Sequence, residues 1–199
     1  VIYSSDNGPW LVMGDHSGFA TPPRAGKGTT YEGGMRVPGI MRWPDTIPAG
    51  SVTSEITSTI DMLPTIAEIT GAEVPTDRII DGESILDIIK GKTGAKSPHE
   101  FFYYYHGTRL QAVRSGEWKL RVKTTMRYED IYWRFENPDA IIPEALYHLP
   151  TDPGEQRNLL PRNPKQYDRM SPKHREVYDR LQALLDTARA DLGDSSQNI

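Results

Sequence analysis

A carboxylate and a carboxamide stand side by side near the start of the chain, where Asp6 and Asn7 are followed by Gly8 and Pro9. Hard cations such as Ca²⁺ prefer oxygen ligands of both kinds. Two side chains are too few for a complete site, because calcium takes about six to eight oxygens. The other interpretation is an ordinary turn, since Asp, Asn, Gly and Pro all favour turns. Taken alone, these residues favour the turn.

A lysine between two glycines, Gly26-Lys27-Gly28, is the second candidate for chemistry. Lysine offers a point charge on a flexible stem, and glycine lets the backbone approach a ligand closely, so the segment could bind an anion. It is not a Walker A phosphate loop, because Gly28 stands where that motif needs Ser or Thr. The alternative is a solvated lysine in a glycine-rich loop, which the segment by itself favours.

Composition narrows the classes of protein. The chain of 199 residues can form one domain or two small ones, and its formal net charge is −4 without a long run of one sign. A general nucleic-acid binder usually carries a basic stripe, so we expect no nucleic-acid partner. No stretch approaches the roughly 18 apolar residues of a membrane span, so we expect no membrane partner. The absence of cysteine excludes disulfides and thiolate metal sites.

Short strands around a long loop are predicted for the start of the chain. Residues 1–5 and 37–43 predict β-strands, and the residues 8–34 between them, rich in Gly, Pro and Thr, predict a loop. Loops of more than about 15 residues are usually functional or disordered. Asp6 and Asn7 follow the first strand at its carboxyl end, where ligands collect in open α/β sheets.

Two helices are predicted next. Residues 61–71 predict a helix with Asp61 as its N-cap and Gly71 at its end. Its apolar residues on one face are Leu63, Ile66 and Ala67, joined by Thr70. Residues 84–91 predict a shorter helix of the same kind, which buries its isoleucines.

Beyond a polar boundary at 92–99, the pattern changes to β-strands. They are predicted at residues 101–105, 110–114, 117–122 and 145–149. Ser115-Gly116 is a two-residue hairpin signal between the middle two. The last element is a helix that begins at Ser171 and ends before Gly193. Its apolar stripe is formed by Val177, Leu181, Leu184, Leu185, Ala188 and Leu192. We expect this helix to cover an antiparallel sheet.

Several motifs in a fixed order are more specific than any one of them. In chain order they are SDNG at 5–8, GKGTTYEGGMRVP at 26–38, TIDMLPTIAEITG at 59–71, DGESI at 81–85 and LYHLPTDPGEQRNL at 146–159. With these motifs the chain resembles the C-terminal half of the type I sulfatases, the arylsulfatase family of the alkaline phosphatase superfamily. The nearest branch is that of arylsulfatase A and N-acetylgalactosamine-6-sulfatase.

The resemblance implies an α/β fold in two parts. Residues 1–95 would be the C-terminal portion of an alkaline-phosphatase-like α/β sheet domain that carries metal- and sulfate-binding residues. Residues 96–199 would form a small α+β subdomain of about four antiparallel strands covered by a C-terminal helix. The segment 123–143 is irregular and aromatic, and the resemblance is weakest there.

The resemblance also assigns roles to residues. Asp6 and Asn7 match family ligands of Ca²⁺, with Mg²⁺ as an alternative ion. Lys27 matches the family lysine that contacts the substrate sulfate, and is expected to be both catalytic and substrate-binding. The Asp-Pro-Gly-Glu motif at 152–155 is expected to organise a turn and to take no part in catalysis.

Three further residues are candidates for contacting the substrate. His16 lies in the long loop and could face the leaving group, although an exposed loop histidine is the alternative. His106 and Arg109 lie at a predicted strand end, in a region that approaches the pocket mouth in related enzymes. Arg109 could meet the carboxylate of an acidic sugar, and a solvated arginine is the alternative.

The family nucleophile is absent from this sequence. It is a formylglycine made from a Cys or Ser in a Cys/Ser-x-Pro-x-Arg motif, and no such motif occurs here. We therefore interpret the chain as a C-terminal fragment of a calcium-assisted, formylglycine-dependent sulfatase acting on aryl or carbohydrate sulfate esters. Its expected partners are a sulfated small molecule or carbohydrate and the N-terminal half of the same protein. Alone, we expect the fragment to be inactive and able to self-associate.

Two other functions stay open on the sequence. The chain could be a non-catalytic binding or structural module. It could also belong to a phosphodiesterase or phosphonate hydrolase of the same superfamily, but the glycine-rich loop around Lys27 favours a sulfatase over that option.

Overall fold

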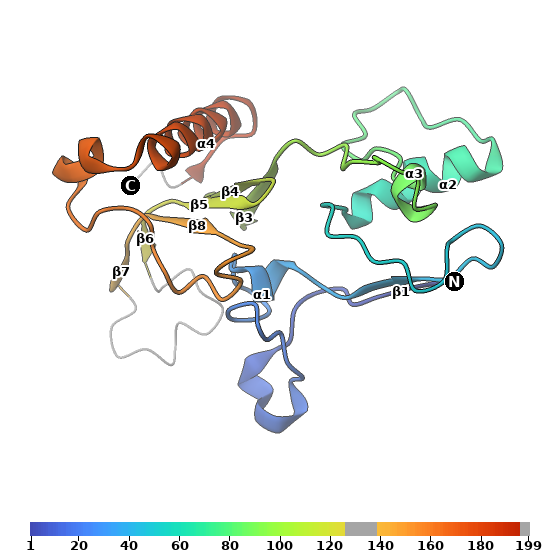
Figure 1. Ribbon diagram of the computed structural model, residues 1–199, viewed down its shortest axis with the longest axis horizontal. Helices are drawn as coiled ribbons and strands as arrows, with labels where there is room; N and C mark the ends of the chain where they lie inside the picture. The colour runs from blue at the N-terminus through green and yellow to red at the C-terminus, as the bar shows by residue number, and fades with distance from the viewer. Residues whose placement is uncertain (126–138, 196–199) are drawn as a thin grey trace. The chain divides into compact units, whose positions relative to one another are not determined.

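The computed structural model describes residues 1–125 and 139–195, and these form two compact units. The first unit contains Val1–Ser4 and Gly39–Glu100, and the second contains Ser5–Pro38 together with the chain from Phe101 onward. Figure 1 labels most of the helices and strands of both units. This grouping differs from a simple division at residue 95, because residues 5–38 pack with the C-terminal part of the chain.

The first unit contains a pair of short strands and two helices. Strands β1 (Ile2–Ser4) and β2 (Gly39–Met41) pair antiparallel, so both predicted strands are confirmed, in shorter form. Helices α2 (Met62–Thr70) and α3 (Leu86–Ile89) confirm the predicted helices, and Gly71 ends α2 in the left-handed conformation with φ of 71°.

Asp61 occupies the predicted N-cap position of α2, but its side chain does not cap that helix. A short 3-10 helix, η2 (Thr59–Asp61), precedes α2, and the Asp61 side chain makes no capping hydrogen bond to α2. Instead, its carboxylate closes a capping box on η2 by accepting a hydrogen bond from the Ser58 amide at 2.7 Å. It also accepts from the Glu83 amide at 3.2 Å and lies 2.7 Å from His99 Nε2. The fully buried Asp61 therefore ties three segments of the first unit together.

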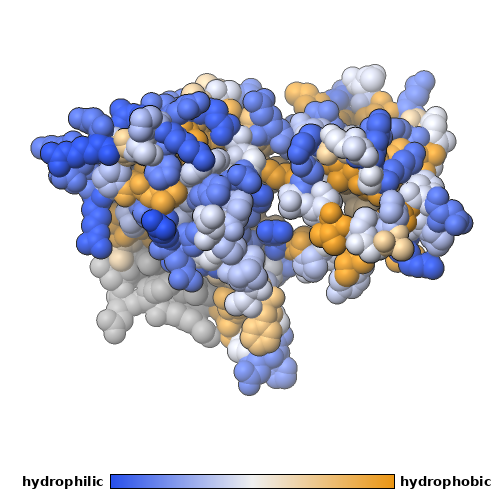
Figure 2. Space-filling model, viewed as in Figure 1, coloured by the Kyte–Doolittle hydropathy of each residue, from blue (hydrophilic) through white to orange (hydrophobic). Residues whose placement is uncertain are grey.

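The predicted buried face of α2 is also wrong in part. Leu63 and Ile66 are each half exposed, whereas Pro64, Thr65 and Ala67 are buried. The exposed face borders an apolar groove of about 390 Å³ within the first unit, lined by residues that include Ile2, Met41, Trp43, Ile66, Ile69 and Ile89. Figure 2 shows apolar side chains gathered on the surface of this unit. The residues of α2 that are buried are thus set by what packs against the helix, and they differ from the apolar face that helical periodicity predicts.

The second unit contains the predicted antiparallel sheet. Its four strands are hydrogen-bonded in the order β3-β4-β5-β8. Their bounds are Phe102–His106, Arg109–Ser115, Trp118–Arg121 and Ala145–His148. In the β4–β5 hairpin Ser115 pairs with Trp118, so the turn residues are Gly116 and Glu117, one position later than predicted. A further pair of short strands, β6 (Thr124–Thr125) and β7 (Ile141–Ile142), flanks residues outside the described range.

Helix α4 (Pro172–Asp191) covers this sheet and completes its core, as predicted (Figure 1). The Ser171 hydroxyl accepts a hydrogen bond from the His174 amide, so Ser171 is the N-cap. A 3-10 helix, η5 (Pro164–Arg169), precedes α4. The core is formed by Leu110, Val113, Leu120, Leu146, Leu160, Val177, Leu181, Leu185 and Ala188. Leu192 is the exception in the predicted stripe, since it is 62% exposed.

The strand β5 carries charged residues on the face opposite its core residue. Leu120 belongs to the apolar core, and its neighbours Lys119 and Arg121 are fully buried. Side chains alternate across a strand, so the two cations point away from the core beneath α4. No helix in the described residues is long and apolar enough to span a membrane.

Candidate functional site

Backbone hydrogen bonds in the second unit connect the turn at residues 6–9 to the glycine-rich segment that carries Lys27. Residues 24–32 of that segment form the lysine loop. The Lys27 amide donates to the Pro9 carbonyl at 2.9 Å, and the Gly8 amide donates to the Gly34 carbonyl at 3.3 Å. The 3-10 helix η1 (Leu11–His16) lies within the intervening chain. Residues 8 and 9, which directly follow Asp6 and Asn7, are thus bonded to the segment that carries Lys27.

Glycines make this close approach possible. A Cβ atom on Gly8 would lie less than 3.0 Å from the carbonyl oxygen of Gly33. One on Gly26 would meet the carbonyl oxygen of Pro9 at a similarly forbidden separation. The glycine-rich composition of the loop is therefore explained in part by backbone packing against backbone.

The Lys27 side chain is exposed beside an aromatic ring. Its ammonium lies 5.1 Å from the centroid of the Trp10 ring, within the range of a cation–π contact. Among the residues that the structure describes, no carboxylate pairs with it. The positive charge is therefore available to an anion, while the backbone of Lys27 is held by Pro9.

The Asp6 and Asn7 side chains are also accessible. Asp6 is exposed and Asn7 is half-buried, and the Asn7 backbone carbonyl accepts a hydrogen bond from the Ser5 hydroxyl at 2.8 Å. Within the described ranges, neither side chain has a hydrogen-bond partner. The same residues contain no group of three or more His, Cys, Asp or Glu side chains that could hold a metal ion.

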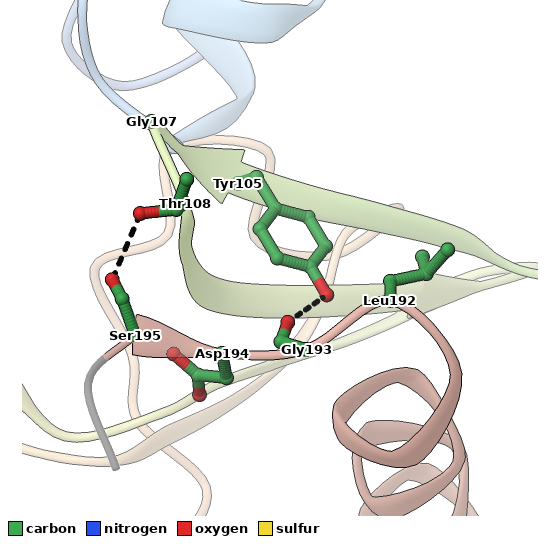
Figure 3. A pocket seen from close by; sticks show the side chains of 7 residues that line it. All are labelled: Tyr105, Gly107, Thr108, Leu192, Gly193, Asp194 and Ser195. Carbon is green, nitrogen blue, oxygen red and sulfur yellow. Dashed lines mark hydrogen bonds between the residues drawn. The ribbon is translucent and has the colours of Figure 1, made fainter. Parts of the chain in front are cut away.

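The remaining candidates lie on other elements. His16 is exposed and ends η1. His106 and Arg109 are half-buried and face each other across the β3–β4 turn. Next to that turn is an open cavity of about 450 Å³, whose lining comprises Tyr105, Gly107, Thr108, Leu192, Gly193, Asp194 and Ser195 (Figure 3). Neither His106 nor Arg109 lines it.

Two hydrogen bonds connect the walls of this cavity. The Tyr105 hydroxyl donates to the Gly193 carbonyl at 3.0 Å, and the Thr108 hydroxyl donates to Ser195 Oγ at 2.9 Å (Figure 3). These bonds join the β3–β4 turn to the residues that follow α4.

A buried cluster of charges fixes the far end of the lysine loop. The Glu32 amide donates to Glu155 Oε2 at 2.6 Å, and the Lys119 ammonium donates to Glu32 Oε1 at 3.0 Å. The same ammonium lies 3.0 Å from Glu155 Oε1, as an ion pair without hydrogen-bond alignment. It also donates to the Thr30 carbonyl at 2.7 Å. Glu32 is 2% exposed, and Lys119 and Glu155 are fully buried.

Glu32 receives further support from the sheet. Arg114 Nη1 donates to its Oε2 at 2.9 Å, and the Tyr104 hydroxyl donates to its Oε1 at 2.9 Å. Burial alone raises the pKa of Glu32, but the positive charges of Lys119 and Arg114 and these hydrogen bonds outweigh it, so the pKa is lowered. Glu32 therefore favours the ionised form despite its burial.

Two guanidinium groups stack on the ring of Tyr31, next to Glu32 in the loop. The guanidinium groups of Arg24 and Arg121 lie 4.2 and 3.7 Å from the centroid of the Tyr31 ring. Arg24 Nη1 also donates to the Glu155 carbonyl at 3.0 Å. The Thr30 hydroxyl donates to Gln111 Oε1 on β4 at 2.6 Å.

The Asp-Pro-Gly-Glu motif has a second role that the sequence interpretation missed. As predicted, it organises a turn, because the Asp152 carboxylate accepts from the amides of Gln156 and Arg157 at 3.0 and 2.8 Å. Glu155, however, points to the lysine loop. The signal that could have revealed this lies in β5, where Lys119 and Arg121 alternate with an apolar core residue and need buried partners.

Comparison with known proteins places these features in a family. The family described as "N-sulphoglucosamine sulphohydrolase, C-terminal" matches residues 25–189. Human arylsulfatase D is 38% identical over 178 residues, covering 79% of this chain and 30% of that protein. Bovine arylsulfatase A is 37% identical over 170 residues, covering 80% and 33%. N-acetylgalactosamine-6-sulfatase of Canis lupus familiaris is 33% identical over 172 residues, covering 78% and 32%.

Solved structures agree with the sequence relatives. The PsFucS1 sulfatase from Pseudoalteromonas sp. superposes with a TM-score of 0.69 at 26% identity, covering 94% of this chain and 37% of that one. The structure of BT4656 in complex with its substrate D-glucosamine-2-N,6-O-disulfate has a TM-score of 0.59 at 25% identity, covering 98% and 34%.

The fold and the matches define the class of protein as a sulfatase with an alkaline-phosphatase-like α/β architecture. The chain belongs to the sulfatase family whose C-terminal region is described as that of N-sulphoglucosamine sulphohydrolase. The resemblance predicted from the motifs is therefore confirmed. The chain spans about a third of the length of these relatives, which is 30% of arylsulfatase D and 33% of arylsulfatase A.

Proposed function

We propose that this chain is the C-terminal part of an enzyme that hydrolyses sulfate esters, with Lys27 as a catalytic residue that contacts the sulfate. The observation that carries the proposal is the placement of Lys27. Its ammonium is exposed, lies over Trp10 and is left unpaired by the carboxylates of the described residues, while its loop is tied to the turn after Asp6 and Asn7. Family membership supports sulfate ester hydrolysis as the reaction.

The contribution of Lys27 would be electrostatic. Breaking the S–O bond moves negative charge onto the sulfate oxygens and the leaving oxygen. A fixed positive charge at that point stabilises the transition state more than the ground state. Because Pro9 holds the backbone of Lys27, only its side chain has to adjust to the substrate.

Asp6 and Asn7 would hold the metal ion that the family uses, which we propose to be Ca²⁺, with Mg²⁺ as the alternative. Their oxygens are of the type that hard cations prefer, and no hydrogen bond in the described residues occupies either side chain. When bound, the ion would act as a Lewis acid on sulfate oxygens. The other ligands and a formylglycine nucleophile would belong to the N-terminal part of the enzyme.

The substrate class follows from the relatives' names and from one complex. Relatives are named for aryl sulfates and for N-acetylgalactosamine 6-sulfate, and BT4656 is described with a disulfated glucosamine as its substrate. We propose an aryl or carbohydrate sulfate ester for the present protein. His16, His106 and Arg109 remain the candidates for contacts with the leaving group.

The N-terminal part of the same enzyme is the proposed partner of the first unit. The apolar groove beside α2 would be covered by the missing α/β elements, since isolated soluble proteins rarely expose such a face. Without that cover, this chain would be inactive and would associate with itself.

The test uses a full-length sulfatase that carries this sequence as its C-terminal part. We expect Lys27→Ala to lower kcat/KM for a nitrophenyl sulfate at least about tenfold, since one transition-state contact of this kind contributes a few kcal/mol. Lys165→Ala, at an exposed position in η5, is the matched control and should leave kcat/KM unchanged.

Two results would contradict the proposal. Unchanged kinetics for Lys27→Ala would remove Lys27 from the site. Faster turnover of a nitrophenyl phosphodiester than of the sulfate ester would indicate a phosphodiesterase of the same superfamily.

A further inference from the structure

We propose that Glu155 is a positioning residue for Lys27, which it controls through the backbone of the loop between Arg24 and Glu32. The inference rests on the proposed function of Lys27. It concerns a residue of the Asp-Pro-Gly-Glu motif, which lies more than a hundred positions away in the sequence.

Glu155 contacts the loop at both of its ends. Its backbone carbonyl accepts from Arg24 Nη1 at 3.0 Å, and its carboxylate accepts from the Glu32 amide at 2.6 Å. Lys27 lies between these two contacts in the sequence. The Gly33 amide donates to the Arg24 carbonyl at 2.8 Å, so the loop is also closed on itself at the point where Glu155 holds it.

The electrostatics make Glu155 hard to replace. Its carboxylate and that of Glu32 lie 3.0 Å from the same Lys119 ammonium, and all of these groups are buried. A buried charge is tolerated only when it is paired and hydrogen-bonded. Neutralising Glu155 leaves Lys119 with a single buried carboxylate partner and weakens the acceptor of the Glu32 amide, so the loop end becomes free to shift.

Glu155 acts at a distance from the chemistry. The Lys27 ammonium is exposed over Trp10 and takes no part in the buried cluster. The influence of Glu155 on Lys27 therefore passes through the loop backbone, forward from Arg24 and back from Glu32. A displacement of about 1 Å in a group that contacts the substrate can lower the rate roughly a hundredfold.

The test is a double-mutant cycle in a full-length sulfatase that carries this sequence. Four proteins are compared: the parent, Lys27→Ala, Glu155→Gln and the double variant. We expect Glu155→Gln to lower kcat/KM about fivefold or more in the parent and less than about twofold in the Lys27→Ala background, because residues that act through one another are not additive. Glu155→Asp, which keeps the charge, should restore part of the loss.

A matched control separates positioning from general stability. Glu144 is a partly buried carboxylate of the same unit that accepts from Tyr167 and Gln182 at 2.9 and 2.6 Å and does not contact the lysine loop. Glu144→Gln should leave kcat/KM within about twofold of the parent in both backgrounds.

Two further measurements keep the proposal open to refutation if Glu155→Gln fails to fold. Arg24→Met removes the hydrogen bond to the Glu155 carbonyl together with the stacking of the guanidinium on Tyr31, and it should show the same non-additivity with Lys27→Ala. In the isolated chain, hydrogen exchange of residues 24–36 should accelerate in Arg24→Met, while exchange in α4 stays unchanged.

The outcomes distinguish this inference from the function on which it rests. If Lys27→Ala lowers turnover but Glu155→Gln and Arg24→Met lower it by the same factor in both backgrounds, the positioning role is wrong and the function of Lys27 stands. If Lys27→Ala leaves turnover unchanged, both are wrong.

Discussion

The two units of this chain differ in what they bury. The second unit buries Leu181, Leu185 and Leu120 completely between α4 and the sheet, and it pairs buried charges on the sheet's other face. The first unit leaves Leu63 and Ile66 half exposed on α2. The second unit has an apolar core of its own, and the first unit presents an apolar groove with room for a partner.

The difference bears on the loop that carries Lys27. This loop belongs to the second unit, where buried ion pairs and stacked guanidinium groups hold it. Its placement therefore does not depend on the first unit having found its partner. The contacts that position Lys27, the proposed sulfate-binding residue, therefore lie within the second unit.

The largest expected effect concerns the buried cluster. Lys119→Met should destabilise the second unit by about 3–5 kcal/mol, because it leaves the carboxylates of Glu32 and Glu155 buried without their shared cation. Urea unfolding followed by circular dichroism measures the change. Lys92→Met, at an exposed pair with Asp87, is the control and should leave the free energy of unfolding nearly unchanged. Equal effects of the two substitutions would show that the cluster does not hold the second unit together.

The next prediction compares the buried apolar face of α4 with the half-exposed apolar face of α2. Leu181→Ala, at a fully buried position of α4, should cost about 2–5 kcal/mol. Ile66→Ala, at a half-exposed position of α2, should cost less than about 1 kcal/mol in the isolated chain. The same urea titration, read at several chain concentrations, measures both. A large loss for Ile66→Ala at the lowest chain concentration would contradict this prediction, whereas a loss that grows with concentration would show that copies of the chain cover the groove, as the proposed self-association implies.

How much the sequence could predict differs between the same two regions. Hydrophobic periodicity and capping residues predicted α4 and its sheet well, because both the helix and its cover lie within the chain. The face of α2 was predicted less well. Periodicity reports which residues are apolar, but burial depends on a neighbour, and the chain offers few neighbours to Leu63 and Ile66.

The candidate site shows a similar limit. The sequence motifs indicated Asp6, Asn7 and Lys27 as candidate site residues. Backbone hydrogen bonds place the segments that carry them next to each other. The role of Glu155 was missed because it depends on a contact across 123 positions with Glu32. Local sequence signals describe the turn around Asp152 and cannot report where a side chain of that turn points.

The smallest expected effect is a dependence of stability on pH that belongs to the second unit. The pKa of Glu32 is lowered from its ordinary value of 4.5: burial opposes ionisation, but Lys119, Arg114 and their hydrogen bonds prevail. A carboxyl group whose folded-state pKa is depressed stabilises the protein above the unfolded-state pKa, and this contribution is lost as pH falls through the folded-state value. The free energy of unfolding should therefore fall below about pH 4.5 more steeply in the parent chain than in Glu32→Gln. Urea midpoints across that range, with exposed Glu176→Gln as the control, measure the difference. Parallel pH profiles for the parent and Glu32→Gln would show that the cations of the sheet do not stabilise the ionised carboxylate, and the lysine loop would then depend on packing alone.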